Sequence, residues 1–349
     1  MSKTNNKIGI GIVGLGVIAN QHAQTILQVK HSELVAASSR SEENRTKFSN
    51  EFDIPVFEDY DEMLQSDDVR AVSICTPSGT HLEYGLKAAE AGKHIIVEKP
   101  IEITVERGQK LLEACEQNGV KLAVIYQNRY SNAVRKLKDA VDSGKIGNPV
   151  MARGTVKWFR TQDYYTGSGW RGTLDLDGGG ALINQSIHTI DLLVWILGDL
   201  KCVFGLKDTL THEGIEAEDN LVASLRFANG ALGLFEASTS IVPPQPRTIE
   251  INGSKGTAVL KGDEFQLFTD DDQTSIDFSE QDDKDLFVKQ YDEIINSILN
   301  GDQPPVSGPE ALKSIAVVEA IYNSCGNQSA VNPSKFIDKH FQSSKNLYS

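Results

Sequence analysis

The chain has 349 residues, which is long for a single hydrophobic core, so two domains are the default expectation. Its 34 basic and 48 acidic residues give a net charge of -14, which argues against nucleic acid or an anionic membrane surface as the main partner. The cysteines are widely spaced, and neither a signal-peptide pattern nor an apolar run of membrane-spanning length is present, so a cytoplasmic location is expected.

The first apolar run, residues 7–19, is typical of a buried strand that continues into a glycine turn and then a helix. Gly14, Gly16 and Ala19 satisfy the pattern G-x-G-x-x-G/A. The first glycine permits a sharp turn, the second permits close approach of backbone to a pyrophosphate, and the small third residue permits close packing of helix and strand. The sequence therefore predicts a dinucleotide site here; the alternative is an ordinary turn between a strand and a helix.

The second predicted strand, residues 33–38, ends at Ser39 and Arg40. A domain that binds NAD is expected to carry Asp or Glu at this place, where the carboxylate accepts hydrogen bonds from the ribose. A hydroxyl beside a guanidinium instead suits a 2′-phosphate, so NADP is favoured over NAD. In the alternative interpretation, Arg40 lies along the adenine or in solvent.

The pattern then alternates between strands and helices up to residue 126. We expect a short strand and helix at 54–64, strands at 69–75, 93–97 and 120–126, and helices at 82–91 and 105–118. This alternation predicts a parallel sheet whose ligands bind at the carboxyl ends of the strands, where Ser39, Thr76 and Lys99 fall. Residues 1–126 are therefore the predicted nucleotide-binding domain.

Residues 127–349 form the predicted second domain, in which strand patterns are spaced as in an antiparallel sheet. A polar and aromatic loop is expected at 161–176, and a helix at 181–197 after three glycines. The other expected helices are 132–143, 285–299 and 309–325, and the expected strands are 150–160, 201–208, 219–227, 231–238, 247–251, 257–260 and 264–268.

Together these residues resemble the glucose-fructose oxidoreductase, inositol dehydrogenase and rhizopine-catabolism (Gfo/Idh/MocA) family of nicotinamide-dependent sugar oxidoreductases. Besides the glycine turn, the resemblance is carried by the stretches 75–77 with His81, 91–100, 170–172 and 177–188. It implies an α/β fold with an N-terminal Rossmann domain, which has a parallel sheet, and a C-terminal α/β domain with a large, mostly antiparallel sheet.

The resemblance implies that Lys99 and His188 move the proton of a sugar hydroxyl while hydride is exchanged with the cofactor. A desolvated lysine and an imidazole both suit proton transfer near neutral pH. Without the resemblance, Lys99 is a surface lysine of a turn and His188 a core histidine, and Asp191 either orients His188 or lies on the helix surface. Many family members have Asp where this chain has Asn184, and an amide orients a hydroxyl but cannot take its proton.

The fingerprint and the resemblance together predict the cofactor-binding set Gly14, Leu15, Gly16, Val17, Ile18, Ala19, Ser39, Arg40, Thr76, Pro77, His81, Glu98, Lys99, Gln127, Trp170, Arg171 and Tyr291. The predicted substrate-binding set is Lys99, Arg160, Tyr165, Trp170, Asn184 and His188. Aromatic faces pack on sugars, and arginines bind carboxylate or phosphate groups. For Tyr164, Tyr165 and Tyr291, core or interface packing is an equally good interpretation.

The leading hypothesis is an NAD(P)-dependent oxidoreductase acting on a ring hydroxyl or keto carbon of a sugar, sugar acid, polyol or sugar nucleotide. The alternatives are a nicotinamide-binding regulatory protein without turnover and a glycosidase-like enzyme with transient cofactor redox. No metal is expected, because the seven histidines show no H-E-x-x-H spacing. The resemblance also implies a homodimer or homotetramer that pairs through the C-terminal sheet.

Overall fold

The computed structural model describes residues 7–269, 276–278 and 285–337. The chain forms two compact units. The first contains Met1–Glu102, Arg107–Gln127 and Lys284–Ala311, and the second contains Ile103–Glu106, Asn128–Asp283 and Leu312–Ser349. This division differs from the sequence-based boundary chiefly in placing residues 284–311 with the N-terminal unit.

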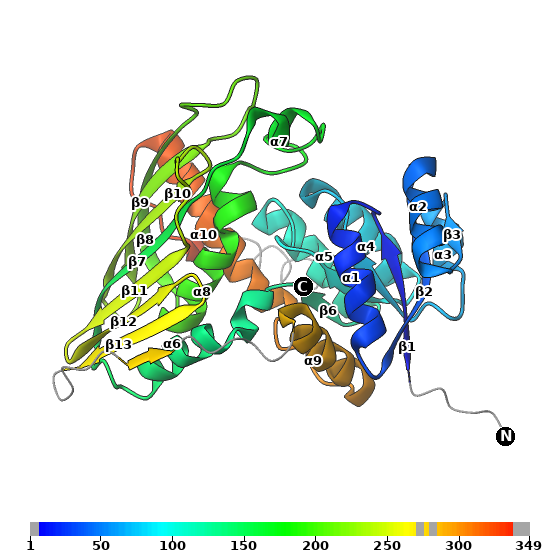
Figure 1. The fold of residues 1–349 in the computed structure, drawn as a ribbon, viewed down its shortest axis with the longest axis horizontal. Coiled ribbons are helices and arrows are strands. Elements are labelled where there is room, and N and C mark those ends of the chain that lie inside the picture. The colour runs from blue at the N-terminus through cyan, green and yellow to red at the C-terminus, as the bar shows by residue number, and fades with distance from the viewer. Residues whose placement is uncertain (1–6, 270–275, 279–284, 338–349) are drawn as a thin grey trace, which may run out of the picture. The chain divides into compact units, whose positions relative to one another are not determined.

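The first unit has a six-stranded sheet of order β3-β2-β1-β4-β5-β6, in which every pair is parallel (Figure 1). This is the strand order of a doubly wound dinucleotide-binding sheet, and it confirms the predicted Rossmann domain. The strands are β1 (Ile8–Val13), β2 (Ser32–Ser38), β3 (Val56–Phe57), β4 (Ala71–Ile74), β5 (His94–Val97) and β6 (Leu122–Val124).

The helices of the first unit are α1 (Val17–Gln28), α2 (Glu42–Phe52), α3 (Tyr60–Leu64), α4 (His81–Glu90), α5 (Val105–Gln117) and α9 (Leu286–Asn300). The sequence pattern did not predict α2, because Phe48 is its one buried residue and no apolar stripe forms. A local signal was present nonetheless, since Ser41 caps this helix by accepting a hydrogen bond from the Asn44 backbone N–H.

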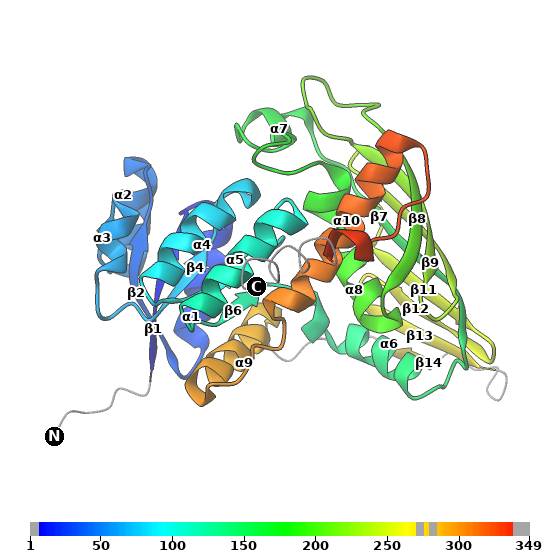
Figure 2. The ribbon, with the colours of Figure 1, turned by 180° about the vertical axis from the view of Figure 1, so that it is seen from behind.

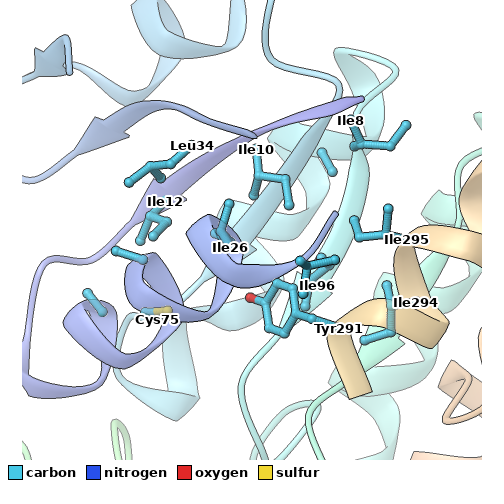
Figure 3. Packing of buried hydrophobic residues seen from close by; sticks show 14 of the residues in the cluster. Ile8, Ile10, Ile12, Ile26, Leu34, Cys75, Ile96, Tyr291, Ile294 and Ile295 are labelled. Atoms are coloured by element: carbon cyan, nitrogen blue, oxygen red, sulfur yellow. The ribbon is translucent and has the colours of Figure 1, made fainter. Parts of the chain in front are cut away.

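The core of the first unit joins β1, α1 and α9 (Figure 3). Ile8, Ile10 and Ile12 of β1 are fully buried. Ile26 of α1 and Ile294 of α9 belong to the same hydrophobic cluster. Burial of each such side chain contributes about 1.5–3 kcal/mol to stability. This packing is the reason that α9, distant in sequence, folds with the nucleotide-binding domain.

The second unit has an eight-stranded sheet of order β14-β13-β12-β11-β7-β10-β9-β8. Its pairs are antiparallel except for β10 with β7, which confirms the prediction of a large, mostly antiparallel sheet. The strands are β7 (Pro149–Lys157), β8 (Leu200–Asp208), β9 (Asn220–Phe227), β10 (Leu232–Ser238), β11 (Thr248–Gly253), β12 (Gly256–Lys261), β13 (Glu264–Thr269) and β14 (Ile276–Phe278).

Helices α6 (Asn132–Asp142), α8 (Ile187–Leu197) and α10 (Gly308–Asn327) lie along one face of this sheet (Figure 2). Close approach of α10 to β8 requires Gly205, where a Cβ would lie 3.0 Å from atoms of Ile321 and Cys325. Strand β9 alternates between buried and exposed side chains, so the opposite face of the sheet has no helix cover among the described residues.

Within the described ranges, no helix is long and apolar enough to cross a membrane. The same residues contain no group of three or more His, Cys, Asp or Glu side chains that could hold a metal ion. All four cysteines are free thiols.

Candidate functional site

The glycine turn between β1 and α1 has the conformation that a dinucleotide site needs. Gly14 has φ 88°, and a Cβ there would lie 2.7 Å from the Thr76 backbone nitrogen. Gly16 is the N-cap of α1, and a Cβ at Gly16 would meet no protein atom within 4 Å. Space therefore lies directly before the N-terminus of α1, whose N–H groups and dipole favour an anion.

The residues around the two glycines divide between packing and exposure. Ala19 is fully buried and Leu15 belongs to the hydrophobic cluster, whereas Val17 is 90% exposed and Ile18 is partly buried. The small side chain of Ala19 lets α1 pack closely on the sheet, as the fingerprint predicts. The residues present thus fit a bound dinucleotide pyrophosphate.

Arg45, which was not predicted from the sequence, holds the backbone of Ser39 and Arg40 at the end of β2. The Arg45 guanidinium donates to the carbonyl oxygens of Ser39 at 2.8 Å and Arg40 at 3.0 Å, and it pairs with Glu58 at 2.9 Å. Ser39 is half-buried and Arg40 is exposed. A guanidinium that holds two carbonyl oxygens fixes the backbone at which the ribose is expected.

His81 joins two segments that were predicted to contact the cofactor. Its ring is buried, with Nδ1 2.9 Å from the carbonyl oxygen of Pro100 and Nε2 3.0 Å from that of Thr76. The Thr76 and Pro77 segment is also closed by Thr80, whose hydroxyl donates to both residues. The buried His81 ring therefore links the backbone carbonyl groups of these two segments.

Glu98 and Lys99 directly follow β5. One carboxylate oxygen of Glu98 accepts the backbone N–H of Lys99 at 3.0 Å, and the other lies 2.9 Å from Nε2 of His22. His22 is fully buried on α1. Burial lowers the pKa of His22, but nearby Cys75, Tyr291 and Glu98 raise it well above its usual value overall. Burial raises the pKa of Glu98, yet the hydrogen bond and charge of His22 lower it overall.

Tyr291 lies in the interior rather than at an open surface (Figure 3). It is 0% exposed, and its hydroxyl lies 2.6 Å from Nδ1 of His22 and 3.0 Å from the Ser73 hydroxyl. Burial raises the pKa of this tyrosine. Core packing therefore accounts for the contacts of Tyr291: its ring is buried, and its hydroxyl faces His22 and Ser73.

In the second unit, the segment predicted as one helix has two parts. Residues Ala181–Ser186 form a π-helix, and α8 starts at Ile187. Asn184 lies in the π-helix and His188 lies in the first turn of α8, both half-buried. Wide turns of this kind are rare and are frequent at functional sites. The buried Glu218 carboxylate accepts the backbone N–H groups of Gly180 and Leu182, which orients this segment.

The carboxylate missing from position 184 is found one hydrogen bond away. Asp177 is buried and accepts the Asn184 side-chain amide at 2.5 Å and the Gly172 backbone N–H at 2.8 Å. An aspartate at position 184 would place two carboxylates within hydrogen-bond distance, which is unfavourable unless one is protonated. An amide at position 184 therefore suits the neighbouring Asp177. The sequence analysis includes Asp177 in the stretch that carries the resemblance but not among the predicted site residues.

Of the two adjacent tyrosines, Tyr164 and not Tyr165 is available at the surface. Tyr165 is 4% exposed, and its hydroxyl lies 2.8 Å from that of Thr239; burial raises its pKa to about 12. Tyr164 is half-buried, and its hydroxyl accepts a hydrogen bond from Gln185 at 2.7 Å. The sequence pattern alone does not distinguish the two, because their burial depends on the loop conformation.

Two arginines stack on Tyr164. The guanidinium carbon of Arg171 lies 4.2 Å from the ring centroid, and that of Arg160 lies 5.2 Å from it. Arg160 donates to Gln185 at 2.7 Å, and Gln185 in turn donates to Asn184 at 2.6 Å. A continuous hydrogen-bonded chain therefore runs from Arg160 to Asp177.

The remaining predicted residues have varied surroundings. Trp170 and Gln127 are half-buried, and the Gln127 side-chain oxygen has no hydrogen-bond partner among the described residues. Asp191 is 1% exposed, so the interpretation that it lies on the helix surface is wrong. It forms a two-point ion pair with Arg129 at 2.8 and 2.7 Å and accepts the Ser314 hydroxyl.

Two family models match the chain. Residues 8–126 match the oxidoreductase family with an NAD-binding Rossmann fold, and residues 134–259 match the GFO/IDH/MocA C-terminal domain. Among curated relatives, myo-inositol 2-dehydrogenase of Thermotoga maritima is 27% identical over 323 residues, covering 86% of this chain and 91% of that protein. Levoglucosan dehydrogenase of Pseudarthrobacter phenanthrenivorans is 26% identical over 310 residues, covering 76% and 77%.

Among solved structures, the WlbA dehydrogenase of Bordetella pertussis in complex with NADH and UDP-GlcNAcA is 31% identical, with a TM-score of 0.86. The comparison covers 95% of this chain and 99% of that one. Both halves of the chain are thus matched, and the doubly wound sheet with its glycine turn agrees with the first family model. The chain therefore belongs to the Gfo/Idh/MocA family and is an NAD(P)-dependent oxidoreductase that acts on CH–OH groups of the sugar and polyol type.

Proposed function

We propose that this enzyme oxidises or reduces a sugar that carries an anionic group, such as a sugar acid or a sugar nucleotide. The observation that carries the proposal is the pair of guanidinium groups on Tyr164. In the described part of the chain, the hydrogen bonds of Arg160 and Arg171 go to carbonyl and amide oxygens rather than to carboxylates, and the Nε atoms of both are buried without a hydrogen-bond partner.

Two half-buried cations on one aromatic ring repel each other unless an anion lies near them. Guanidinium groups bind carboxylate and phosphate oxygens through parallel hydrogen bonds, and the ring of Tyr164 offers a face for the apolar side of a sugar. The WlbA structure, whose protein is 31% identical to this chain, contains the anionic sugar nucleotide UDP-GlcNAcA, which supports the same substrate class here.

The reacting group needs proton transfer as well as binding. When bound, the nicotinamide cofactor supplies hydride exchange at the sugar carbon. We assign proton movement at the sugar hydroxyl to Lys99 and His188, and orientation of that hydroxyl to Asn184, whose amide Asp177 and Gln185 hold in place. Asn184 cannot carry the proton, because an amide has no exchangeable charge state near neutral pH.

The test is a panel of sugars assayed by the absorbance of reduced nicotinamide. UDP-GlcNAcA is the anionic probe, and myo-inositol, levoglucosan and D-xylose are neutral probes. We expect kcat/KM for the anionic probe to exceed that of each neutral probe. A neutral sugar as the best substrate would overturn the proposed substrate class but leave the oxidoreductase assignment in place.

For the cofactor we propose a preference for NADP. The end of β2 presents Ser39 and the exposed Arg40, with no carboxylate at the expected ribose position, and Arg45 holds the backbone of both residues. A guanidinium and a hydroxyl suit a 2′-phosphate, which a carboxylate would repel.

Replacing Ser39 by aspartate is expected to weaken NADPH binding roughly 10- to 100-fold, because a hydrogen bond to a charged group is worth about 1.5–3 kcal/mol. Fluorescence titration with NADPH and NADH measures this change. Ser66→Asp adds the same charge beyond α3 and should change neither affinity. Tighter binding of NADH than of NADPH by the unsubstituted protein would contradict the preference.

We also propose that the protein forms a homo-oligomer through the open face of the large sheet. Exposed apolar side chains gather there in adjacent register positions: Leu234 of β10 lies two strands from Phe204 of β8, and Val222 of β9 pairs with Leu206. Each of these four is at least 38% exposed in the single chain. Contiguous apolar surface of this kind is typical of an interface.

Replacing both Leu234 and Val222 by aspartate is expected to convert the oligomer into a monomer of 38.2 kDa, since paired carboxylates cannot be buried in an apolar interface. Light scattering after size exclusion measures the mass. Leu27→Asp, at an exposed leucine of α1, is the matched control and should leave the mass unchanged. A monomeric unsubstituted protein would refute the interface.

A further inference from the structure

The first unit contains a buried ionic network that the sequence analysis did not identify. His22 on α1 is fully buried and lies 2.9 Å from one oxygen of the Glu98 carboxylate. The second oxygen of Glu98 accepts the backbone N–H of Lys99 at 3.0 Å. A single carboxylate therefore connects the helix that follows the glycine turn with the backbone of Lys99.

We propose that His22 is a positioning residue for Lys99, acting through Glu98; the proposal rests on the assigned role of Lys99 in proton transfer. Nε2 of His22 faces the Glu98 carboxylate, which accepts a hydrogen bond, and Nδ1 faces the hydroxyls of Ser73 at 2.8 Å and Tyr291 at 2.6 Å. The ring is thus fixed from β4 and α9 while Nε2 holds Glu98. A reacting lysine needs such a fixed backbone, since small displacements lower the rate strongly.

The charge state of the pair supports this arrangement. Among the described residues, three segments face His22. Ser73 lies in β4 and Cys75 directly follows it, Phe287 and Tyr291 lie on α9, and Glu98 follows β5. Burial opposes a charge on His22, but its neighbours raise its pKa well above the usual value overall. The lowered pKa of Glu98 agrees with an ion pair.

The two shifts define a pH window for the network. Because folding raises the pKa of His22, this group stabilises the folded protein fully at a pH below its pKa in the unfolded chain. The stabilisation is lost as the pH rises through its pKa in the folded protein. Because folding lowers the pKa of Glu98, this group stabilises the folded protein at a pH above its pKa in the unfolded chain. The stabilisation is lost as the pH falls through its pKa in the folded protein. The contribution of the pair to stability therefore falls toward both acid and alkaline pH.

The test compares His22→Gln and Glu98→Gln with Thr25→Ala. Thr25 is also fully buried on α1, but its hydroxyl donates to the Gln21 carbonyl oxygen of the same helix. We expect both network variants to lower kcat on the order of 10- to 100-fold, as loss of supporting contacts to a reacting group typically does. The KM for UDP-GlcNAcA should stay unchanged in both variants, as should the Kd for NADPH in His22→Gln, and Thr25→Ala should behave like the unsubstituted protein.

A second readout does not depend on turnover. Because Glu98 accepts the Lys99 N–H, hydrogen exchange at the Lys99 amide should accelerate in His22→Gln and Glu98→Gln but not in Thr25→Ala. Wild-type kcat together with a protected Lys99 amide in His22→Gln would overturn the proposal. If the unsubstituted protein oxidises no sugar of the panel, the proposed substrate class fails and the amide exchange alone decides the role of His22.

If His22→Gln does not fold, nitrogen NMR of the unsubstituted protein provides the decision. The proposal requires Nε2 of His22 to carry a proton at neutral pH, because the Glu98 carboxylate accepts the hydrogen bond between them. An unprotonated Nε2 at neutral pH would overturn it.

Discussion

Lys99→Met and His188→Gln are each expected to lower kcat about 10²- to 10⁴-fold, which is the usual contribution of a positioned acid or base. Both substitutions keep much of the side-chain volume but remove the group that moves a proton. The Kd for NADPH should change far less than kcat, because neither substitution touches the glycine turn at Gly14 and Gly16. Stopped-flow measurement of hydride transfer gives kcat, and fluorescence titration gives Kd.

Lys93→Met is the matched control for Lys99. Lys93 precedes β5 and donates to the Ser66 carbonyl oxygen at 3.0 Å, so it is a lysine that fixes a turn. Its substitution should leave kcat unchanged. If Lys99→Met and His188→Gln both retain normal turnover, the assignment of proton transfer to these residues is wrong. Lys99 would then be a lysine that fixes a turn.

Removing the guanidinium groups at Tyr164 is expected to raise KM for an anionic sugar. Arg160→Ala and Arg171→Ala should each raise KM for UDP-GlcNAcA roughly 10- to 100-fold, because each removes charge-assisted hydrogen bonds worth about 1.5–3 kcal/mol. The KM for myo-inositol should change little, since a neutral polyol has no anionic group. Steady-state kinetics with both sugars measure the difference.

Two controls separate charge from stacking and substrate from cofactor. Arg135 stacks on Tyr130 at 5.1 Å, and Arg135→Ala should leave KM for both sugars unchanged. Arg160→Lys keeps the charge but loses the planar, two-point geometry, so it should recover only part of the affinity. If Arg171→Ala weakens NADPH binding while KM for UDP-GlcNAcA stays constant, the arginine pair serves the cofactor, and the proposed substrate class is wrong.

The sequence predicted those parts of the fold that depend on local pattern. The apolar runs of β1 and β5 are buried on both faces, so they appear as continuous hydrophobic segments, and Gly14 marks the turn because only glycine adopts its φ without strain. The helix α2 was missed for the converse reason, since one buried residue leaves no periodic signal. The π-helix was also missed, because residues 181–197 contain no glycine or proline that would separate it from the α-helix that follows.

The sequence predicted site residues that a motif places at the end of a strand. It did not predict which of two neighbouring, chemically similar residues the tertiary packing buries. The sequence placed Ser39, Thr76 and Lys99 at strand ends, which the structure confirms for β2, β4 and β5. It offered no means to separate Tyr164 from Tyr165, since one residue step decides which ring the loop buries. The hydrogen bond from Asn184 to Asp177 likewise depends on how the glycine segment folds.

The sequence by itself determined the doubly wound sheet, the glycine turn and the family, because these rest on short-range periodicity and on motifs of fixed spacing. Only the tertiary structure decided that α9 joins the first unit and that His22, Ser73, Glu98 and Tyr291 share one buried network. The physical reason is that a polar ring such as that of His22 is stable in an interior only where hydrogen-bonding groups surround it, and here distant segments bring these groups together. Contacts over such separations leave no local pattern in the chain.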